Sequence, residues 1–342
     1  MDLFGFDPPE IAPNEMAAIA RSHWGIRGVA MHLRGERSAN ARLVADDGAE
    51  YLLQVKSATE RPEVTDLETK ALLHLAERDP GLPVARVVPT VHDEPLAVVE
   101  RDGSTHLGRL VTYLPGTTFD PDEQLPESTY WAIGDVLGRL AAGLSDFDHP
   151  AADHFMPWDI ANGLIVDDGL RSHLGAGREV IQSVDERLHA VATAMSTLPR
   201  ATVHNDGHAG NLVRPDASSP RVSGVIDFGD LVHTVAAADV AIAAESFAPD
   251  HPDPTATLAA IADGYHRRSP LSEEEISALP DLVLARAALS VLLLEYMLTH
   301  VPRVAAGASH ALTGVIDRLG RWHALDPVAM SEQVAERLES RT

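Results

Sequence analysis

The first third of the chain carries short segments in which apolar and polar positions alternate, the pattern of β-strands with one buried face. Three of them, GVAMHLRG, ANARLVADDG and AEYLLQVKS, follow one another along the sequence. Tyr51, Leu53 and Val55 share one face of the third segment. Lys56 therefore projects from the other face. The DDG sequence at residues 46–48 is a strong hairpin signal, so we expect strands joined by turns.

Helical spacing of apolar residues flanks these strands. The segment PNEMAAIARSHWGI predicts a short helix with Asn14 as its N-cap, and a second helix is expected at residues 63–77. Two more strands are expected at PLAVVE and RLVTYL, the second of which ends in a Pro-Gly turn. The chain beyond that turn is expected to be mainly helical. We place the boundary there, between an N-terminal lobe at residues 1–114 and a helical C-terminal lobe at residues 115–342.

The composition narrows the classes of partner. The chain has 342 residues and a formal net charge of -24, from 51 acidic against 27 basic side chains, which disfavours nucleic acid as a partner. It has no cysteine, which excludes disulfides and thiolate metal sites. The acidic N-terminus lacks the pattern of a secretory signal, so we expect a cytoplasmic protein. The apolar stretch LPDLVLARAALSVLLLEYML is interrupted by Asp281, Arg286 and Glu295, which favours a buried core helix over a membrane span.

The densest group of polar side chains lies in VHNDGHAGNLV, residues 203–213. Its two glycines indicate a loop. The nearby VSGVIDFGD predicts a short buried strand, formed by Val222, Val225 and Ile226, that ends at Asp227. Carboxylate and amide oxygens are the ligands that magnesium prefers, and it shares them with substrate phosphates. The spacing of these polar residues therefore favours metal-assisted phosphoryl transfer, which uses one aspartate on the nucleophile and an asparagine and a second aspartate on the metal.

A transition-metal cluster is the alternative interpretation of the same loop. His204 and His208 with Asp206 are side chains that zinc or iron would accept. The H-x-H-x-D-H order of metallo-hydrolases is absent, however, and no third histidine follows at ligand spacing. His204 follows an apolar residue, so we interpret it as a structural support of the loop. His208 lies between the other polar residues and is a candidate for acceptor specificity.

The pair H-x-D-x-x-x-x-N and I-D-F-G-D resembles the small-molecule branch of the protein-kinase-like fold, the aminoglycoside phosphotransferase and choline kinase superfamily. The segments RLVTYLPG and VSGVIDFGDLVHT look most like the hydroxylysine kinase subfamily. This resemblance implies an α+β, bilobal fold, with a small antiparallel-sheet N-lobe that carries one helix and a larger, mainly helical C-lobe. It also implies that Asp206 is the catalytic residue and that Asn211 and Asp227 bind Mg2+. Asn205 departs from the family, which often has glycine there, and Asp239 resembles the acid that braces the catalytic loop.

A kinase also requires a nucleotide site in the N-terminal lobe, for ATP or GTP. Lys56 ends a strand, and Glu68 lies on the inward stripe of the following helix. Thr65-x-x-Glu68 also fits a capping box, in which Glu68 caps its own helix. Pro62 favours an earlier helix start, which leaves Glu68 free to form an ion pair with Lys56.

Two more segments are expected to contact the nucleotide. Ser38 and Asn40 lie in the segment RGERSANAR, where the resemblance places the loop that covers the phosphates, although G-x-G-x-x-G is absent. Thr112, Tyr113 and Leu114 resemble the strand and hinge that receive the base through main-chain groups.

The acceptor is expected to be a small amine or amino acid, because no long activation segment separates D-F-G from the next predicted helix. Asp230 and Glu245 are candidates for binding a substrate ammonium group, and Arg286 for binding a carboxylate. Trp158 resembles a subfamily residue that borders the site. Hydroxylysine is the best candidate. An aminoglycoside, homoserine, choline or ethanolamine is the closest alternative, and a nucleotide-binding pseudokinase that acts through a partner is an alternative of another class.

Overall fold

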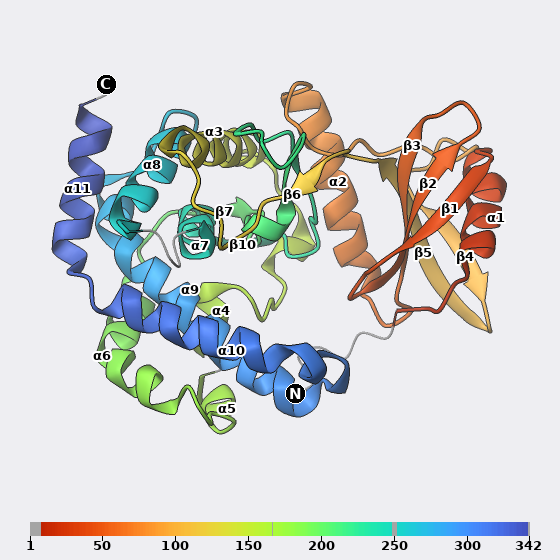
Figure 1. The fold of residues 1–342 in the computed structure, drawn as a ribbon. Coiled ribbons are helices and arrows are strands. Elements are labelled where there is room, and N and C mark those ends of the chain that lie inside the picture. Colours follow the sequence, from red (N-terminus) through yellow and green to blue (C-terminus); the bar gives the residue numbers. More distant parts are fainter. Residues whose placement is uncertain (1–7, 166, 248–251, 341–342) are drawn as a thin grey trace. The chain divides into compact units, whose positions relative to one another are not determined.

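The computed structural model describes residues 8–165, 167–247 and 252–340, and the chain divides into two compact units, Met1–Pro115 and Gly116–Thr342. The first unit consists of one sheet with two helices and the second is mainly helical (Figure 1). The predicted α+β class is therefore confirmed.

The first unit is built on a five-stranded antiparallel sheet with the strand order β1-β2-β3-β5-β4. Its elements are α1 (Pro13–Trp24), β1 (Gly28–Leu33), β2 (Ser38–Ala45), β3 (Glu50–Lys56), α2 (Pro62–Arg78), β4 (Ala97–Arg101) and β5 (Ser104–Thr112). The predicted strands are all present. The hairpin expected at DDG is present as well, because Ala45 donates its N–H to the Ala49 carbonyl across the turn.

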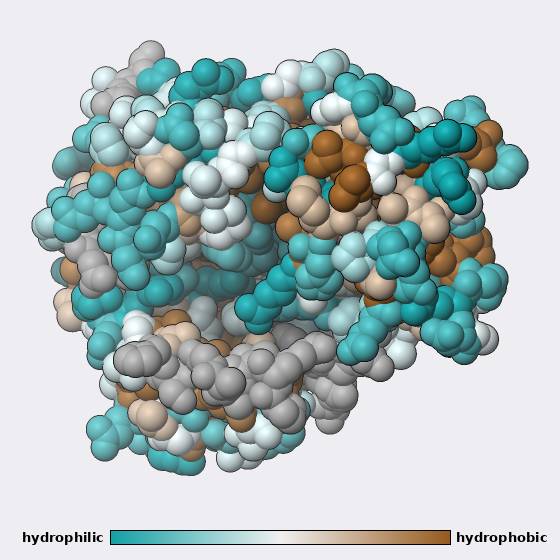
Figure 2. Space-filling view, turned by 45° about the vertical axis from the view of Figure 1, so that its right-hand side comes forward, coloured by the Kyte–Doolittle hydropathy of each residue, from teal (hydrophilic) through white to brown (hydrophobic). Residues whose placement is uncertain are grey.

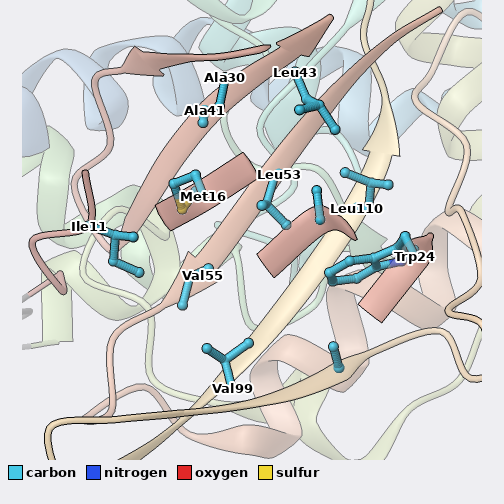
Figure 3. Packing of buried hydrophobic residues seen from close by; sticks show 12 residues of the cluster. Ile11, Met16, Trp24, Ala30, Ala41, Leu43, Leu53, Val55, Val99 and Leu110 are labelled. Carbon is cyan, nitrogen blue, oxygen red and sulfur yellow. The ribbon is translucent and has the colours of Figure 1, made fainter. Parts of the chain in front are cut away.

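Helix α1 covers one face of this sheet (Figure 3). Met16 and Trp24 pack there against Leu53 and Leu110, the face that the alternation of β3 assigned to the core. The helix begins one residue before Asn14, so the predicted Asn14 cap is wrong. A proline at the first helical position and a glutamate in the first turn, which accepts the cap N–H, take over that function.

Helix α2 begins at Pro62, as the proline suggested, and its cap residue Arg61 makes no side-chain capping bond. Four apolar side chains on one stripe of α2 are buried: Val64, Leu67, Ala71 and Leu75. Glu68 lies on the same buried side. The capping-box interpretation of Glu68 is therefore wrong, because the helix starts too early for it.

The second unit carries helices around short strands. Its helices are α3 (Glu127–Leu144), η1 (Pro150–Asp153), α4 (Ile160–Ile165), α5 (Asp167–Arg171), α6 (Arg178–Ala194), η2 (Ala209–Asn211), α7 (Ala238–Phe247), α8 (Pro254–His266), α9 (Glu273–His300), α10 (Pro302–His323) and α11 (Pro327–Glu339). Its strands are β6 (Thr117–Thr118), β7 (Arg200–Val203), β8 (Leu212–Arg214), β9 (Gly224–Val225) and β10 (Val232–Val235). They form two small sheets, β10-β7 and β6-β8-β9.

These short strands flank the polar loop. Strand β7 leads into it and β8 leads out, and β8 pairs with β9 just before Asp227. The strand predicted over Val222, Val225 and Ile226 is shorter than expected, since only Gly224–Val225 pairs. The expectation that only a short segment separates Asp227 from the next helix is confirmed, since α7 begins at Ala238. Strand β10 lies in that segment and pairs with β7, which ties the segment after Asp227 to the strand before the loop.

Helix α9 is the central helix of the second unit. Among the described residues it is the single helix long and apolar enough to cross a membrane, but 78% of its most apolar window is buried inside the protein. Two of the charged residues that interrupt it contact neighbouring elements. Asp281 pairs with Arg187, and Glu295 accepts the N–H groups of Gly175 and Gly177. These contacts agree with the prediction of a core helix.

The face visible in Figure 2 is mostly hydrophilic with small apolar areas.

Candidate active site

The polar loop is held by a buried carboxylate on α7. Both oxygens of Asp239 accept main-chain N–H groups, from His204 at 3.2 Å and from Asn205 at 2.8 Å. Burial raises the pKa of Asp239, although the two N–H groups and His204 act in the opposite direction. These are the contacts that the predicted bracing role of Asp239 requires. They fix the backbone immediately before Asp206.

His204 supports the same loop from inside the unit. Its side chain is fully buried, its Nε2 donates to the Ile226 carbonyl at 3.1 Å, and its ring lies edge-on to Phe228. The histidine thus connects the loop to the segment that carries Asp227. This position fits the structural support predicted for His204 and leaves Nε2 unavailable for a metal.

Two residues of the site have left-handed backbone conformations. Among the described residues, four non-glycine residues have positive φ: Asp93 and Asp102 in the first unit, and Asn205 and Asp227 in the second. Asn205 has φ of 64° and Asp227 has φ of 62°. Such conformations cost free energy for residues with a Cβ, least for Asn and Asp, and they cluster at functional sites. Asn205 therefore adopts the conformation for which the family's glycine is suited.

Asp206 lies within a ring of hydrogen-bond donors and positive charge. Asn211 Nδ2 donates to Asp206 Oδ2 at 2.6 Å, while His208 Nε2 and Arg286 Nη2 each lie 3.6 Å from a carboxylate oxygen. Burial raises the pKa of Asp206, but the neighbouring histidines and Arg286 outweigh it, so the pKa lies below its ordinary value. The carboxylate, 19% exposed, is ionised and oriented.

Arg286 on α9 approaches Asp206 from the side of the helical core. Its guanidinium stacks over the Trp158 ring, with 5.0 Å to the ring centroid, and Nη1 donates to the Trp158 carbonyl at 2.8 Å. Its Nε is buried without a hydrogen-bond partner. The structure thus brings together three residues predicted from the sequence, Asp206, Arg286 and Trp158. An anionic group beside Asp206 would find a buried cation there with donor capacity left.

His208 is more exposed than Asp206, with 41% of its side chain accessible against 19%. Its Nδ1 accepts the Gly210 N–H at 3.0 Å, which places the proton of the neutral ring on Nε2, toward Asp206. Burial lowers the pKa of His208, but Asp206 outweighs burial and raises it. A separation of 3.6 Å is too long for a direct hydrogen bond, so we treat the contact as electrostatic.

Asn211 and Asp227 fit a hard divalent cation. The Asn211 amide nitrogen is used by Asp206, which leaves Oδ1, the atom that magnesium or calcium would take. Asp227 is exposed, and the backbone before it donates from Ile226 to the Asn211 carbonyl, so the two ligands lie on adjacent segments. In the described part of the chain, no group of three His, Cys, Asp or Glu side chains is placed to hold a metal ion. These two candidate oxygen ligands therefore suit a cation that takes its other ligands from phosphates and water, and the transition-metal interpretation receives no support.

The first unit contains a separate buried cluster of charges. Lys56 Nζ lies 2.8 Å from both oxygens of Glu68, so the predicted ion pair is present. Arg109 on β5 adds a second cation, with Nη2 2.7 Å from Glu68 Oε2. Burial raises the pKa of Glu68, but Lys56 and Arg109 outweigh it and the pKa lies below its ordinary value. Arg109 is absent from the predicted set.

The loop predicted to cover the phosphates is a tight turn after β1. Ser38 Oγ donates to Asn40 Oδ1 at 2.7 Å, so these two side chains bind each other. A Cβ on Gly35 would lie 2.3 Å from the Ser38 carbonyl, so this position requires glycine. Both side chains belong to strand β2, directly after the turn, and their predicted role in nucleotide binding stays a prediction.

Two main-chain amides of the segment predicted to receive the base are already hydrogen-bonded within the unit. Thr112 donates its N–H to the Arg86 carbonyl and Tyr113 donates its N–H to the Glu50 carbonyl. Those two amides are used within the unit, so the predicted main-chain contacts to the base would come from other groups of this segment. Leu114, which is half-buried, and the carbonyl groups of this segment stay candidates.

The remaining acceptor candidates differ in their surroundings. Asp230 is half-buried just before β10. Glu245 is buried on α7 and forms an ion pair with Arg318 of α10 at 3.0 Å, so its expected role as an open ammonium ligand is disfavoured. The next residue, Ser246, accepts the Ala209 N–H and so orders the loop before Asn211. The sequence analysis missed Ser246, whose one signal was its place on the helix that carries Asp239.

Comparison with known proteins gives a consistent result. A family model described as the phosphotransferase enzyme family (APH) matches residues 31–276. Hydroxylysine kinase from Danio rerio is 25% identical over 312 residues, which cover 86% of each chain. Homoserine kinase from Nitrobacter winogradskyi is 32% identical over 167 residues, which cover 46% of this chain and 47% of the relative.

Two solved structures show the same fold. A microcompartment-associated aminopropanol kinase aligns with a TM-score of 0.72 at 19% identity, covering 92% of this chain and 99% of the other. Amicoumacin kinase hAmiN, in complex with AMP-PNP, Ca2+ and Ami, aligns with a TM-score of 0.64 at 16% identity, covering 85% and 88%. At these identities the two alignments show the fold alone.

Proposed function

Because the chain belongs to the phosphotransferase enzyme family and is a small-molecule kinase, we propose that it phosphorylates a side-chain hydroxyl of an amino acid, with hydroxylysine as the best candidate. The donor in this proposal is a nucleoside triphosphate, ATP or GTP, bound with Mg2+. A hydroxylysine kinase is among its relatives, and AMP-PNP and Ca2+ are bound in a structure of similar fold. The observation that carries the choice of acceptor is the buried Arg286 guanidinium 3.6 Å from Asp206.

Asp206 acts on the acceptor hydroxyl. Asn211 engages Oδ2, so Oδ1 is the oxygen that accepts a hydrogen bond from the hydroxyl. Because the pKa of Asp206 is lowered, its main contribution is orientation, and it takes the proton as the phosphoryl group is transferred. The left-handed backbone at Asn205 and the bonds to Asp239 keep that oxygen in place.

Lys56 and the oxygen ligands Asn211 and Asp227 act on the phosphates. Lys56, held by Glu68, supplies a positive charge to the α- and β-phosphates. Asn211 Oδ1 and the Asp227 carboxylate would hold the metal, whose chemistry is to neutralise charge on the phosphates. The catalytic effect of these residues is positioning and charge stabilisation.

Arg286 favours an acceptor that carries a carboxylate. Its guanidinium is buried beside the residue that binds the hydroxyl. In the described part of the chain its recorded ion pair is with Asp206, at a distance longer than that of a bidentate pair. A hydroxy amino acid carries a carboxylate in addition to its hydroxyl, whereas choline, ethanolamine and aminopropanol do not. The Trp158 ring under the guanidinium limits its movement.

Matched acceptors test this proposal. Hydroxylysine is compared with 1,5-diaminopentan-2-ol and homoserine with 3-aminopropanol, since each pair differs only by the carboxylate, and nucleotide consumption is measured with MgATP and MgGTP. We expect kcat/KM to be at least about tenfold higher for the amino acid in each pair, the value of one charged hydrogen bond. Arg286→Met should remove that preference, while Arg187→Met, on another arginine that contacts α9, should retain it.

Equal rates within each pair would exclude carboxylate recognition and favour an amino-alcohol kinase. Homoserine turnover without hydroxylysine turnover would keep the carboxylate and change the substrate. Nucleotide binding without turnover of any acceptor would favour the pseudokinase alternative.

A further inference from the structure

Arg109 is the third member of the buried charge cluster in the first unit, and no sequence motif predicted it. Glu68 is 1% exposed, and its two oxygens receive three donor contacts, two from Lys56 and one from Arg109. Arg109 Nη2 also donates to Gln54 Oε1 at 2.8 Å. The guanidinium therefore joins two neighbouring strands, β3 and β5, to helix α2 through one buried group.

We propose that Arg109 is a positioning residue for the nucleotide: it fixes the Glu68 carboxylate and shares its negative charge, so that Lys56 retains positive charge for the phosphates. This inference rests on the proposed role of Lys56 in nucleotide binding. It does not depend on the identity of the acceptor.

The charge around Glu68 supports this role. Lys56, Arg109 and Arg37 act electrostatically on Glu68, and the second carboxylate nearby is Glu60. The buried part of the cluster consists of two cations, Lys56 and Arg109, and one carboxylate, Glu68. Its formal charges leave one positive charge in excess, within a chain whose net charge is -24.

Excess positive charge in a buried cluster is unfavourable until an anion compensates it. A simple Lys–Glu pair would be neutral and would offer a phosphate little attraction. With Arg109 present, Glu68 divides its hydrogen bonds between two cations, and the cluster is electrostatically complementary to a polyphosphate.

A purely structural role is the competing explanation, in which Arg109 only ties the strands to α2. That role predicts lower thermal stability without a change in nucleotide affinity. The two explanations predict different results when the charge of residue 109 is removed and its hydrogen bond to Glu68 is kept. Arg109→Gln retains a donor toward Glu68 and loses the charge, whereas Arg109→Lys retains the charge.

The experiment is calorimetric titration of each variant with MgAMP-PNP, together with kcat, nucleotide KM and the thermal midpoint. We expect Arg109→Gln to raise the nucleotide Kd about tenfold, as the loss of one charged contact would. Arg109→Lys should stay within about threefold of the wild type, and the acceptor KM should not change. Arg101→Met is the matched control, because Arg101 forms ion pairs on β4 of the same sheet.

Coupling to Glu68 gives the second test. In a Glu68→Gln background, Arg109→Gln should change the nucleotide Kd by less than about twofold, since the carboxylate through which it acts is gone. A wild-type Kd for Arg109→Gln, or full additivity with Glu68→Gln, would overturn the proposal. Failure of the wild type itself to bind MgAMP-PNP or MgGTP would instead count against the proposed function.

Discussion

The two charged regions of this molecule are built on opposite principles. In the first unit Lys56, Glu68 and Arg109 are almost completely buried and bind one another at 2.7–2.8 Å. In the loop of the second unit Asp206 is partly exposed, His208 and Arg286 each lie 3.6 Å from its carboxylate, and Asp227 is exposed. The cluster is ordered by its own side chains, whereas the loop is ordered through its backbone.

This difference fits the roles that we propose for the two regions in phosphoryl transfer. A group that holds phosphates can be fixed in advance by strong ion pairs, because its charge is all that the reaction needs. A group that binds the reacting hydroxyl needs a free oxygen, so other residues must hold it from behind. The hydrogen bonds of Asp239, His204 and Ser246 hold the loop through main-chain groups and leave the Asp206 carboxylate unbonded by these three side chains.

Loss of the Glu68 charge should have the largest effect on stability. Glu68→Gln leaves buried cations without compensation, which should cost about 3–5 kcal/mol. Asp66→Asn, which breaks the exposed Asp66–Lys70 pair of the same helix, should cost less than about 1 kcal/mol. Urea unfolding at neutral pH measures both. Equal losses would show that burial does not separate the two pairs.

The same substitution should change the response to acid. The pKa of Glu68 in the folded protein lies below its ordinary value of 4.5. The ionised carboxylate therefore contributes stability that is complete above pH 4.5 and is lost as the pH falls through the lower folded value. Glu68→Gln should lack this part of the acid dependence. An unchanged slope of unfolding free energy against pH in that range would contradict the assignment.

A substitution that strains the loop backbone at Asn205 should destabilise the protein less than the loss of the Glu68 charge does. It should also lower the rate of phosphoryl transfer. Asn205→Ala and Asp93→Ala both place alanine at a left-handed φ, 64° and 63°, and each should cost about 1 kcal/mol. Only Asn205→Ala should lower kcat, by about tenfold, because misplacement of Asp206 is costly. Asn205→Gly should restore the rate. A normal kcat for Asn205→Ala would show that the strained backbone does not orient the carboxylate.

Local patterns were sufficient for much of this structure. Alternation in β3 placed Lys56 on the correct face, and the distance from Pro62 to Glu68 already favoured the ion pair over a cap. The loop motif is short, so the contact of Asp206 with Asn211 follows from a spacing of five residues.

Contacts between distant segments escaped prediction. Arg109 stands 41 residues from Glu68, and an arginine on a strand carries no local sign of its partner. The sequence did not reveal the ion pair of Glu245, because its partner Arg318 lies 73 residues further along the chain. Strand β10 has four residues and exists through its pairing with β7, so tertiary pairing rather than local alternation determines it.

We propose that the first unit binds the nucleotide phosphates and that the loop of the second unit acts on the acceptor. This account is tested most directly by comparing Asp206→Asn with Lys56→Met. For each variant the nucleotide Kd is measured by calorimetry and phosphoryl transfer by single-turnover kinetics, with Asp216→Asn, an exposed acid near the loop, as control. We predict that Asp206→Asn keeps the nucleotide Kd within about threefold and lowers transfer about 100- to 10,000-fold, while Lys56→Met raises the Kd. Transfer at the wild-type rate in Asp206→Asn, or a loss of nucleotide binding equal to that of Lys56→Met, would contradict the account.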